Sequence, residues 1–263
     1  MLKYIFRFFE VNMIKRLSLY TLMLAFVPIF LWLFGFHWQE SQPVSWFDHF
    51  LFLFTESAGK PFFVLTCAFF AFLYFLFIPN KKQALTVIMI MALTLGMTQG
   101  IKKVAKPFFA EIRPFMNAYF ERTHSEPDLF YLESRKTQSK IIKHYYQTQP
   151  ITENISQQPK WLINHRADET NYSFPSGHSL FAATWMLLAA GFGFLLRKQA
   201  PKLKYVTAGI ALWALLVLLS RVWLGLHYPI DLLASILISW GICCSVFIFI
   251  DKKLAAKMDL TNK

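Results

Sequence analysis

This chain is poor in charge and in cysteine. Asp, Glu, Lys and Arg together make up 16% of its 263 residues, against about 25% in soluble domains. That shortage excludes a highly charged, disordered chain and disfavours an ordinary soluble enzyme. Three cysteines, none of them in CxxC spacing, exclude a disulfide scaffold and give no sign of a zinc or redox site.

Acidic residues are especially few: 15 against 27 Lys and Arg, which gives a net charge of +12. An excess of this size is typical of nucleic-acid-binding proteins when the basic residues form one binding surface. The position of the basic residues along the chain therefore decides what the excess means.

Apolar sequence is abundant. Hydrophobic residues make up 56% of the chain, and 29 residues are Phe. A bilayer core about 30 Å thick is crossed by roughly 20 apolar helical residues, and six stretches approach or exceed that length: 17–36, 61–80, 83–101, 171–196, 205–226 and 232–250. Backbone groups in lipid must be paired within the segment, so we predict six transmembrane helices in an all-α integral membrane protein. The first stretch is long for a signal peptide and lacks a small-residue cleavage site, so we interpret it as a retained span.

The basic residues are concentrated on one side of these spans. The N-terminal segment, the short connections after spans two and four, and the C-terminal segment together contain 14 Lys and Arg against three acidic residues. Lys and Arg accumulate on the cytoplasmic side of membranes, which predicts that both termini are cytoplasmic. The excess charge is therefore a topology signal, and no nucleic-acid partner is expected.

Two segments outside the spans lie on the opposite side. Residues 45–54 are short and aromatic, and we interpret them as an interfacial helix. Residues 107–174 are too long for a structureless loop, and their interleaved aromatic residues indicate a small helical cap. The predicted organisation is a single domain, with spans one to three in 1–106, the cap in 107–174 and spans four to six in 175–263.

Polar residues gather at the non-cytoplasmic ends of the spans. Lys106, Arg113 and Arg221 are three cations without matching acids, and guanidinium groups suit phosphate oxygens. Ser176 and Gly177 open span four, where free backbone N–H groups and the helix dipole favour an anion. Ionisable groups at the edge of a span are costly and usually functional. The set predicts a phosphate-binding site.

Two histidines and an aspartate accompany these cations. His227 and Asp231 are spaced i, i+4, so on a helix the carboxylate can accept from one ring nitrogen and leave the other free as a nucleophile. His178 would supply the general acid and base. The sequence contains no clustered acidic residues that suggest a metal site, and no cofactor is expected.

Each of these features has a simpler interpretation when it is taken alone. Lys102 and Lys103 are interpreted as membrane-edge anchors whose side chains extend toward water. A Pro-Ser-Gly helix start and an i, i+4 His–Asp pair are both common. The prediction of a catalytic site rests on their joint occurrence on one side of the membrane.

The chain resembles the type 2 phosphatidic acid phosphatase superfamily in three motifs, which match in order and spacing: Lys106-x6-Arg113-Pro114, Pro175-Ser176-Gly177-His178 and Ser220-Arg221-x5-His227-x3-Asp231. The resemblance implies one catalytic domain in a bacterial inner membrane, with six spans and a periplasmic active site. It also implies a metal-independent phosphohistidine mechanism. In that mechanism His227 is the nucleophile, Asp231 orients it and His178 donates the proton. The phosphate would be held by Lys106, Arg113, Ser176, Gly177 and Arg221.

The resemblance also implies lipid phosphate substrates: phosphatidylglycerophosphate, phosphatidic acid, lysophosphatidic acid, diacylglycerol pyrophosphate and undecaprenyl pyrophosphate. Membrane lipids are thus the expected partners, and no obligate protein partner is inferred. Three alternatives stay open: a dedicated undecaprenyl pyrophosphate phosphatase, a non-catalytic anion transporter and vanadate-dependent peroxidase chemistry. Many transporters carry internal repeats, which this chain lacks, and peroxidases with these motifs are soluble.

Overall fold

The computed structural model describes residues 2–149 and 158–261, with side chains described over 12–149 and 158–252. All regular structure in these ranges is helical, which confirms the predicted fold class. The helices are α1 (Leu2–Leu33), α2 (Trp46–Ala58), α3 (Phe63–Phe77), α4 (Lys81–Phe109), α5 (Pro114–Thr123), α6 (Pro127–Leu132), α7 (Arg135–Thr148), α8 (Lys160–Asp168), α9 (Gly177–Leu195), α10 (Leu203–Trp223) and α11 (Pro229–Thr261).

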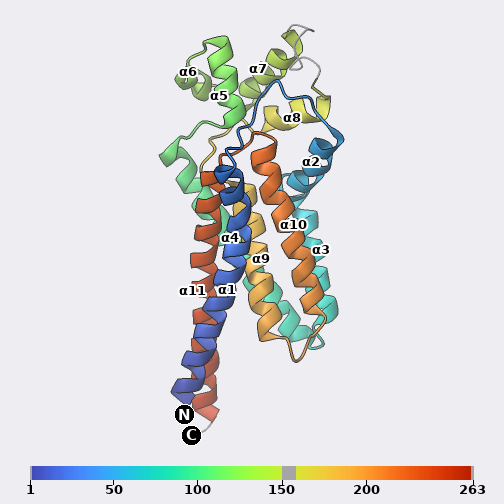
Figure 1. Ribbon diagram of the computed structural model, residues 1–263. Coiled ribbons are helices and arrows are strands. Elements are labelled where there is room, and N and C mark those ends of the chain that lie inside the picture. Colours follow the sequence, from blue (N-terminus) through green and yellow to red (C-terminus); the bar gives the residue numbers. More distant parts are fainter. Residues whose placement is uncertain (1, 150–157, 262–263) are drawn as a thin grey trace.

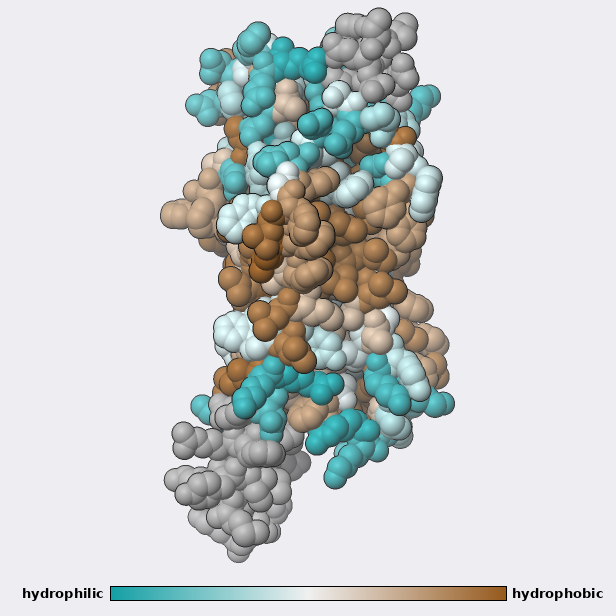
Figure 2. Space-filling view, viewed as in Figure 1, coloured by the Kyte–Doolittle hydropathy of each residue, from teal (hydrophilic) through white to brown (hydrophobic). Residues whose placement is uncertain are grey.

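The long helices form a bundle with a cap at one end (Figure 1). Helices α1, α4, α9, α10 and α11 run along the long axis, and α5 to α8 lie together beyond one end of the bundle. The two chain ends and the α9–α10 connection lie at the opposite end. On the face shown in Figure 2, an apolar belt crosses the middle of the molecule between two hydrophilic zones, as expected for a protein that spans a bilayer.

Five helical segments of the described chain are long and apolar enough to cross a membrane. The second predicted span, 61–80, differs, because α3 contains 15 residues. At 1.5 Å per residue it is about 22 Å long, short of a core of about 30 Å. Helices α2 and α3 pass the test as a pair that is bent by 75°. The straight span at 61–80 is therefore wrong in extent, and the bent pair would make the sixth span.

The fourth span begins at Gly177, within the Pro175-Ser176-Gly177 motif that was predicted to open it, although the apolar stretch extends back to 171. Ser176 caps the helix, since its hydroxyl accepts a hydrogen bond from the backbone N–H of Ser179 at 3.3 Å. Before it, Pro175 has no N–H to donate to a helix, and the chain over 171–174 is not helical. That segment is available to contribute side chains and carbonyls to a site.

Helix α9 is the centre of the bundle. Every residue from Ser179 through Phe192 is buried, and α9 packs against α1, α4, α10 and α11. A helix that is apolar on all sides has to be surrounded by other helices or lipid. The first turn of α9, which holds His178, is therefore fixed by the most buried element of the molecule.

The cap has its own core. Its aromatic residues pack together and against the α10–α11 connection, with Phe115, Tyr119, Phe120, Phe130, Tyr145 and Tyr146 buried. Helix α8 ends at Asp168, so the chain leaves the cap through Glu169 and returns to the bundle at α9. The cap thus places both Arg113, at its start, and Glu169, at its end, over the bundle.

Candidate active site

Arg113 lies at the junction between the bundle and the cap. It precedes Pro114, which favours an extended backbone, and it is the N-cap residue of α5. Its side chain is 1% exposed. A buried guanidinium is costly unless its donors are satisfied. Here Nε donates to the Asn171 carbonyl at 2.7 Å, NH1 to the Leu226 carbonyl at 2.9 Å and NH2 to Glu169 Oε2 at 2.6 Å.

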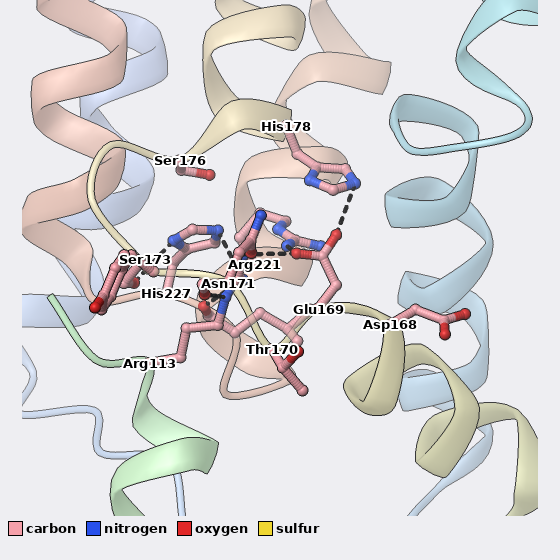
Figure 3. Close-up of polar contacts among 12 residues, drawn as sticks. Arg113, Asp168, Glu169, Thr170, Asn171, Ser173, Ser176, His178, Arg221 and His227 are labelled. Atoms are coloured by element: carbon pink, nitrogen blue, oxygen red, sulfur yellow. Dashed lines mark hydrogen bonds and ion pairs between the residues drawn. The ribbon is translucent and has the colours of Figure 1, made fainter. Parts of the chain in front are cut away.

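Glu169 is the point on which three basic side chains converge (Figure 3). Its Oε2 is 2.6 Å from Arg113 NH2 and 3.5 Å from Arg221 NH2, and its Oε1 is 3.8 Å from His178 Nε2. Asp168, the preceding residue, points away from the cluster. The structure therefore brings Arg113 and Arg221 together, but the expectation that these cations lack a matching acid is wrong, because Glu169 pairs with both.

Burial acts to raise the pKa of Glu169, but the charges of Arg113, Arg221 and His178 outweigh it and hold that pKa well below the usual range. Glu169 is therefore a carboxylate at neutral pH. Its two anionic oxygens face basic groups of the kind that bind phosphate oxygens.

Several donors around this carboxylate lack partners. Within the described part of the chain, Arg221 Nε and His178 Nε2 are buried and have no hydrogen-bond partner. Arg221 NH1 donates to Thr55 Oγ1 of α2, which fixes the guanidinium in place. Buried polar groups are rarely left unsatisfied, so these free donors indicate a site that is completed by a bound ligand.

The partners of His227 determine which ring nitrogen carries its proton. Nε2 lies 3.1 Å from Arg113 NH1, and Arg can only donate, so Nε2 is the unprotonated acceptor. Nδ1 lies 3.0 Å from Asp231 Oδ2 and donates to it. The predicted i, i+4 pair is thus formed, and the lone pair of Nε2 faces the cation site.

Burial, together with the positive charges of Arg113, Arg221 and Lys106, lowers the pKa of His227 well below 6.5. The ring is therefore neutral at neutral pH, which a nucleophilic nitrogen requires. Asp231 is positioned to stabilise the ring once it becomes positive.

Ser173 is a further contact of this pair. Its hydroxyl donates to Asp231 Oδ2 and lies 3.1 Å from His227 Nδ1. The backbone N–H of Tyr228 also donates to Asp231 Oδ2, at 3.0 Å. Three donors therefore hold one carboxylate oxygen, which fixes the orientation of the His227 ring.

The other predicted phosphate ligands lie at the edge of the cluster. Lys106 Nζ donates to the carbonyls of Tyr172 and Ser173, so it holds the non-helical segment that precedes α9. Ser176 is fully buried, and its hydroxyl caps α9. The space in front of Gly177 is taken by Lys102, whose Cδ would lie 2.5 Å from an added Cβ.

Lys102 is therefore not the membrane-edge anchor that its position in the sequence suggested. Its ammonium donates to Gln99 Oε1 at 2.5 Å, and Gln99 in turn donates to the Gly177 carbonyl at 3.4 Å. Lys103, the neighbouring residue, is exposed. One turn of α4 thus brings a further cation to the start of α9.

Sequence reasoning missed four residues of this cluster: Glu169, Asn171, Ser173 and Lys102. Glu169 and Asn171 lie in a polar stretch where no spacing distinguishes them from solvent-exposed residues. Ser173 directly precedes the Phe174-Pro175-Ser176-Gly177-His178 motif, and that proximity was the available signal.

Comparison with known proteins gives a consistent result. The model of the PAP2 superfamily matches residues 84–255. Phosphatidylglycerophosphatase B of Haemophilus influenzae is 43% identical over 241 residues, covering 92% of this chain and 98% of that protein. Phosphatidylglycerophosphatase B of Escherichia coli K12 is 33% identical over 231 residues, covering 87% and 85%. Undecaprenyl-diphosphatase of Sulfolobus acidocaldarius is 38% identical over 83 residues, covering 31% and 35%.

The family match spans well over half of the chain and contains Lys106, Arg113, His178, Arg221 and His227. It confirms the resemblance drawn from the three motifs. This chain belongs to the PAP2 superfamily, the type 2 phosphatidic acid phosphatases.

Proposed function

We propose that this protein is a membrane phosphatase that removes phosphate from lipid headgroups, with phosphatidylglycerophosphate as its principal substrate. The observation that carries the proposal is the cluster around Glu169. Two buried guanidinium groups and an imidazole converge on one carboxylate, beside the lone pair of His227 Nε2. The relatives that this chain matches over most of its length are phosphatidylglycerophosphatases, which supports the substrate.

The phosphate of the substrate takes the place of the Glu169 carboxylate between Arg113 and Arg221. The unpartnered donors of Arg221 and His178 then bind its oxygens, and the guanidinium groups stabilise the charge that builds up in the transition state. Ser176 and Gly177 contribute the start of α9, and Lys106 and Lys102 add positive charge from α4.

In the first step His227 Nε2 attacks phosphorus and the bond to the lipid oxygen breaks. Asp231 stabilises the positive ring that forms, and His178 gives its proton to the leaving oxygen. In the second step His178 takes a proton from water, and the resulting hydroxide attacks the phosphohistidine. Orthophosphate leaves and His227 is regenerated. The negative phosphate beside His178 favours the protonated ring that the first step needs.

The charge pattern supports both termini in the cytoplasm and the cap and active site in the periplasm of a bacterial inner membrane. Lipids such as phosphatidic acid, lysophosphatidic acid and diacylglycerol pyrophosphate present the same terminal phosphate. We expect them to be substrates too, because the cluster contacts phosphate rather than glycerol.

The test is phosphate release by the purified protein in detergent with a chelator present, across these lipids. His227→Gln and His178→Gln should each lose at least about 100-fold in kcat, the lower range for a general acid or base. His144→Gln, an exposed histidine of the cap, is the matched control and should keep full activity. Radiolabelled phosphate should be trapped as an acid-labile adduct in the wild type and not in His227→Gln. Full activity in either site variant, or complete loss in chelator, contradicts the proposal.

A dedicated undecaprenyl pyrophosphate phosphatase is the second candidate, and the partial match to an undecaprenyl-diphosphatase favours it. Turnover of undecaprenyl pyrophosphate and of phosphatidylglycerophosphate at equal surface density decides between them. A rate on the isoprenoid lipid that exceeds the other by more than about tenfold would support the second candidate.

A further inference from the structure

The two oxygens of the Asp231 carboxylate have different surroundings. Oδ2 accepts hydrogen bonds from Ser173 Oγ, His227 Nδ1 and the backbone N–H of Tyr228. Oδ1 is buried, and no N–H group or hydroxyl of the described residues donates to it. Buried polar atoms are rarely left without a partner, because an unpaired one costs free energy. A further donor is therefore expected beside Oδ1.

Glu111 is in position to be this donor. It lies in the connection between α4 and α5, two residues before Arg113, and its backbone carbonyl accepts a hydrogen bond from the Ser173 N–H at 2.6 Å. Its side chain lies within hydrogen-bond reach of the Asp231 carboxylate. Ser173 therefore contacts both acids, because its N–H binds Glu111 and its hydroxyl binds Asp231.

Two carboxyl groups in contact have to share a proton. An ionised carboxyl has no hydrogen to donate, and two negative charges this close repel each other. A protonated Glu111 removes that repulsion and supplies the donor that Oδ1 of Asp231 lacks. Burial and the charge of Asp231 raise the pKa of Glu111 to about 7. Glu111 therefore keeps its proton at pH values at which an ordinary glutamate is ionised.

The surroundings of the pair place the proton on Glu111 and the charge on Asp231. The three hydrogen bonds to Asp231 Oδ2 favour its ionised form. Tyr228 is a second titratable group that faces Glu111, and burial raises its pKa, so it stays neutral. Its hydroxyl accepts a hydrogen bond from Asn117 Nδ2 at 2.6 Å. Arg113, the nearest cation in the sequence, directs its donors to other partners.

We propose that Glu111 is a positioning residue for the nucleophile, with its carboxyl proton donated to Asp231 Oδ1. The inference rests on the proposed function and adds to it a residue that orients His227 through Asp231. With both oxygens held, the Asp231 carboxylate keeps one orientation, and the ring keeps Nε2 directed at phosphorus. When Glu111 loses its proton, the two carboxylates repel and this orientation is lost. Turnover should therefore fall as Glu111 ionises.

Glu111→Gln provides the test, because an amide of the same shape donates a hydrogen bond at every pH. The measurement is kcat/KM of the purified protein on phosphatidic acid across neutral pH, which reports groups of the free enzyme. Glu126→Gln, at an exposed glutamate of the cap, is the matched control. The ratio of a variant to the wild type removes the titration of the substrate and of His178, which all the proteins share.

At about pH 6 Glu111→Gln should match the wild type. At about pH 8 only about a tenth of the wild type keeps the Glu111 proton, so the variant should be faster by about tenfold. Glu111→Ala has no donor at any pH. It should be about tenfold slower than the wild type at about pH 6, within the range that misplacement causes, and should approach it at about pH 8. Glu126→Gln should follow the wild type throughout.

Infrared spectroscopy gives a readout that needs no turnover. The wild type at low pH should show the C=O stretch of a protonated carboxyl, which disappears as the pH rises and is absent from Glu111→Gln. If Glu111→Gln fails to fold, Glu111→Ala serves both comparisons.

A ratio of Glu111→Gln to wild type that does not change with pH would overturn the proposal. A wild-type spectrum without a carboxyl band that the substitution removes would also overturn it. A wild type that shows the band but hydrolyses neither phosphatidic acid nor phosphatidylglycerophosphate would instead contradict the proposed function. The two failures are therefore distinguishable.

Discussion

The His227 imidazole has a different partner on each nitrogen, and the two partners have opposite charge. Arg113 donates to Nε2 and Asp231 accepts from Nδ1. The arrangement selects one tautomer and keeps the lone pair on the nitrogen that faces the phosphate site. It also resists protonation, because a proton on Nε2 would meet the Arg113 charge.

This arrangement predicts how His227 titrates. Its folded pKa is lowered by burial and by the nearby cations, so the neutral, nucleophilic form persists below pH 6.5 and is lost only at lower pH. The nitrogen-15 NMR signals of labelled histidines in detergent should show His227 neutral at pH 6. Among the cations, Arg113 lowers the pKa of His227 most. In the Arg113→Gln variant the pKa of His227 should therefore lie closer to 6.5. The signals of His227 are assigned by their absence from the spectrum of His227→Asn. A titration midpoint of His227 at or above pH 6.5 in the wild type would refute this account.

The pairing of His227 with Asp231 and the presence of the Arg113 cation beside them could be predicted at this scale, because helical spacing and charge type are visible in sequence. Glu169 could not be. Its position depends on how the cap folds back over the bundle, and nothing local separates it from the other acids of the insert. Lys102 illustrates the same limit, because its role depends on α9 lying beside α4.

At the scale of elements, the break between α2 and α3 decides how His178 is held. The two helices are bent by 75°, and Gly59 at the end of α2 lies directly against the His178 ring. Any side chain at this position would have to share the space of the imidazole. The backbone of Gly59 is extended, with φ −108° and ψ 177°, so it is the absence of a Cβ that matters.

Gly59→Ala should therefore impair catalysis without unfolding the protein. The added Cβ would lie 2.6 Å from His178 Nε2 and force the ring to turn away from the site. We expect kcat to fall by about 100-fold, comparable with loss of a general acid, while KM changes little. Gly35→Ala is not a suitable control, because Gly35 has a φ of +63°. Gly100→Ala meets open space and should keep wild-type kcat; wild-type kcat in Gly59→Ala would contradict the role of this contact.

The helical spans were predictable because apolar length is a strong signal. The residues at which the helices begin and end were harder to predict. Residues 171–174 belong to the apolar stretch but precede α9, and Arg113 and Lys106 bind the carbonyls of Asn171 and Tyr172 there. The bend between α2 and α3 lies at Gly59-Lys60-Pro61, residues that commonly interrupt a helix, whereas the packing of α2 on α10 has no local signal in the sequence.

At the scale of the whole molecule, the fold and the charge pattern agree. The α9–α10 connection, which carries three basic residues, lies at the same end as both chain ends, and the cap lies at the other (Figure 1). The positive-inside rule then predicts which end faces the cytoplasm.

Cysteine labelling tests this orientation in intact bacterial spheroplasts. Leu132→Cys in the cap should react with a membrane-impermeant maleimide, and Lys198→Cys in the α9–α10 connection should react only after permeabilisation; both positions are exposed. The native cysteines lie in the spans, and the unsubstituted protein gives the background. Labelling of Lys198→Cys alone in intact spheroplasts would reverse the predicted topology.

The carboxylate of Glu169 has a consequence for turnover. In the proposed mechanism the entering phosphate displaces Glu169 from the cations, so its binding free energy is only the difference between its own attraction to them and that of Glu169. After hydrolysis the exchange is reversed, and Glu169 displaces the phosphate from the cations. Orthophosphate, no longer tethered to a lipid, has to compete with a carboxylate held at the site by the chain itself. An internal competitor of this kind limits product retention, so the enzyme can bind its substrate strongly during the reaction without being trapped by the phosphate it releases.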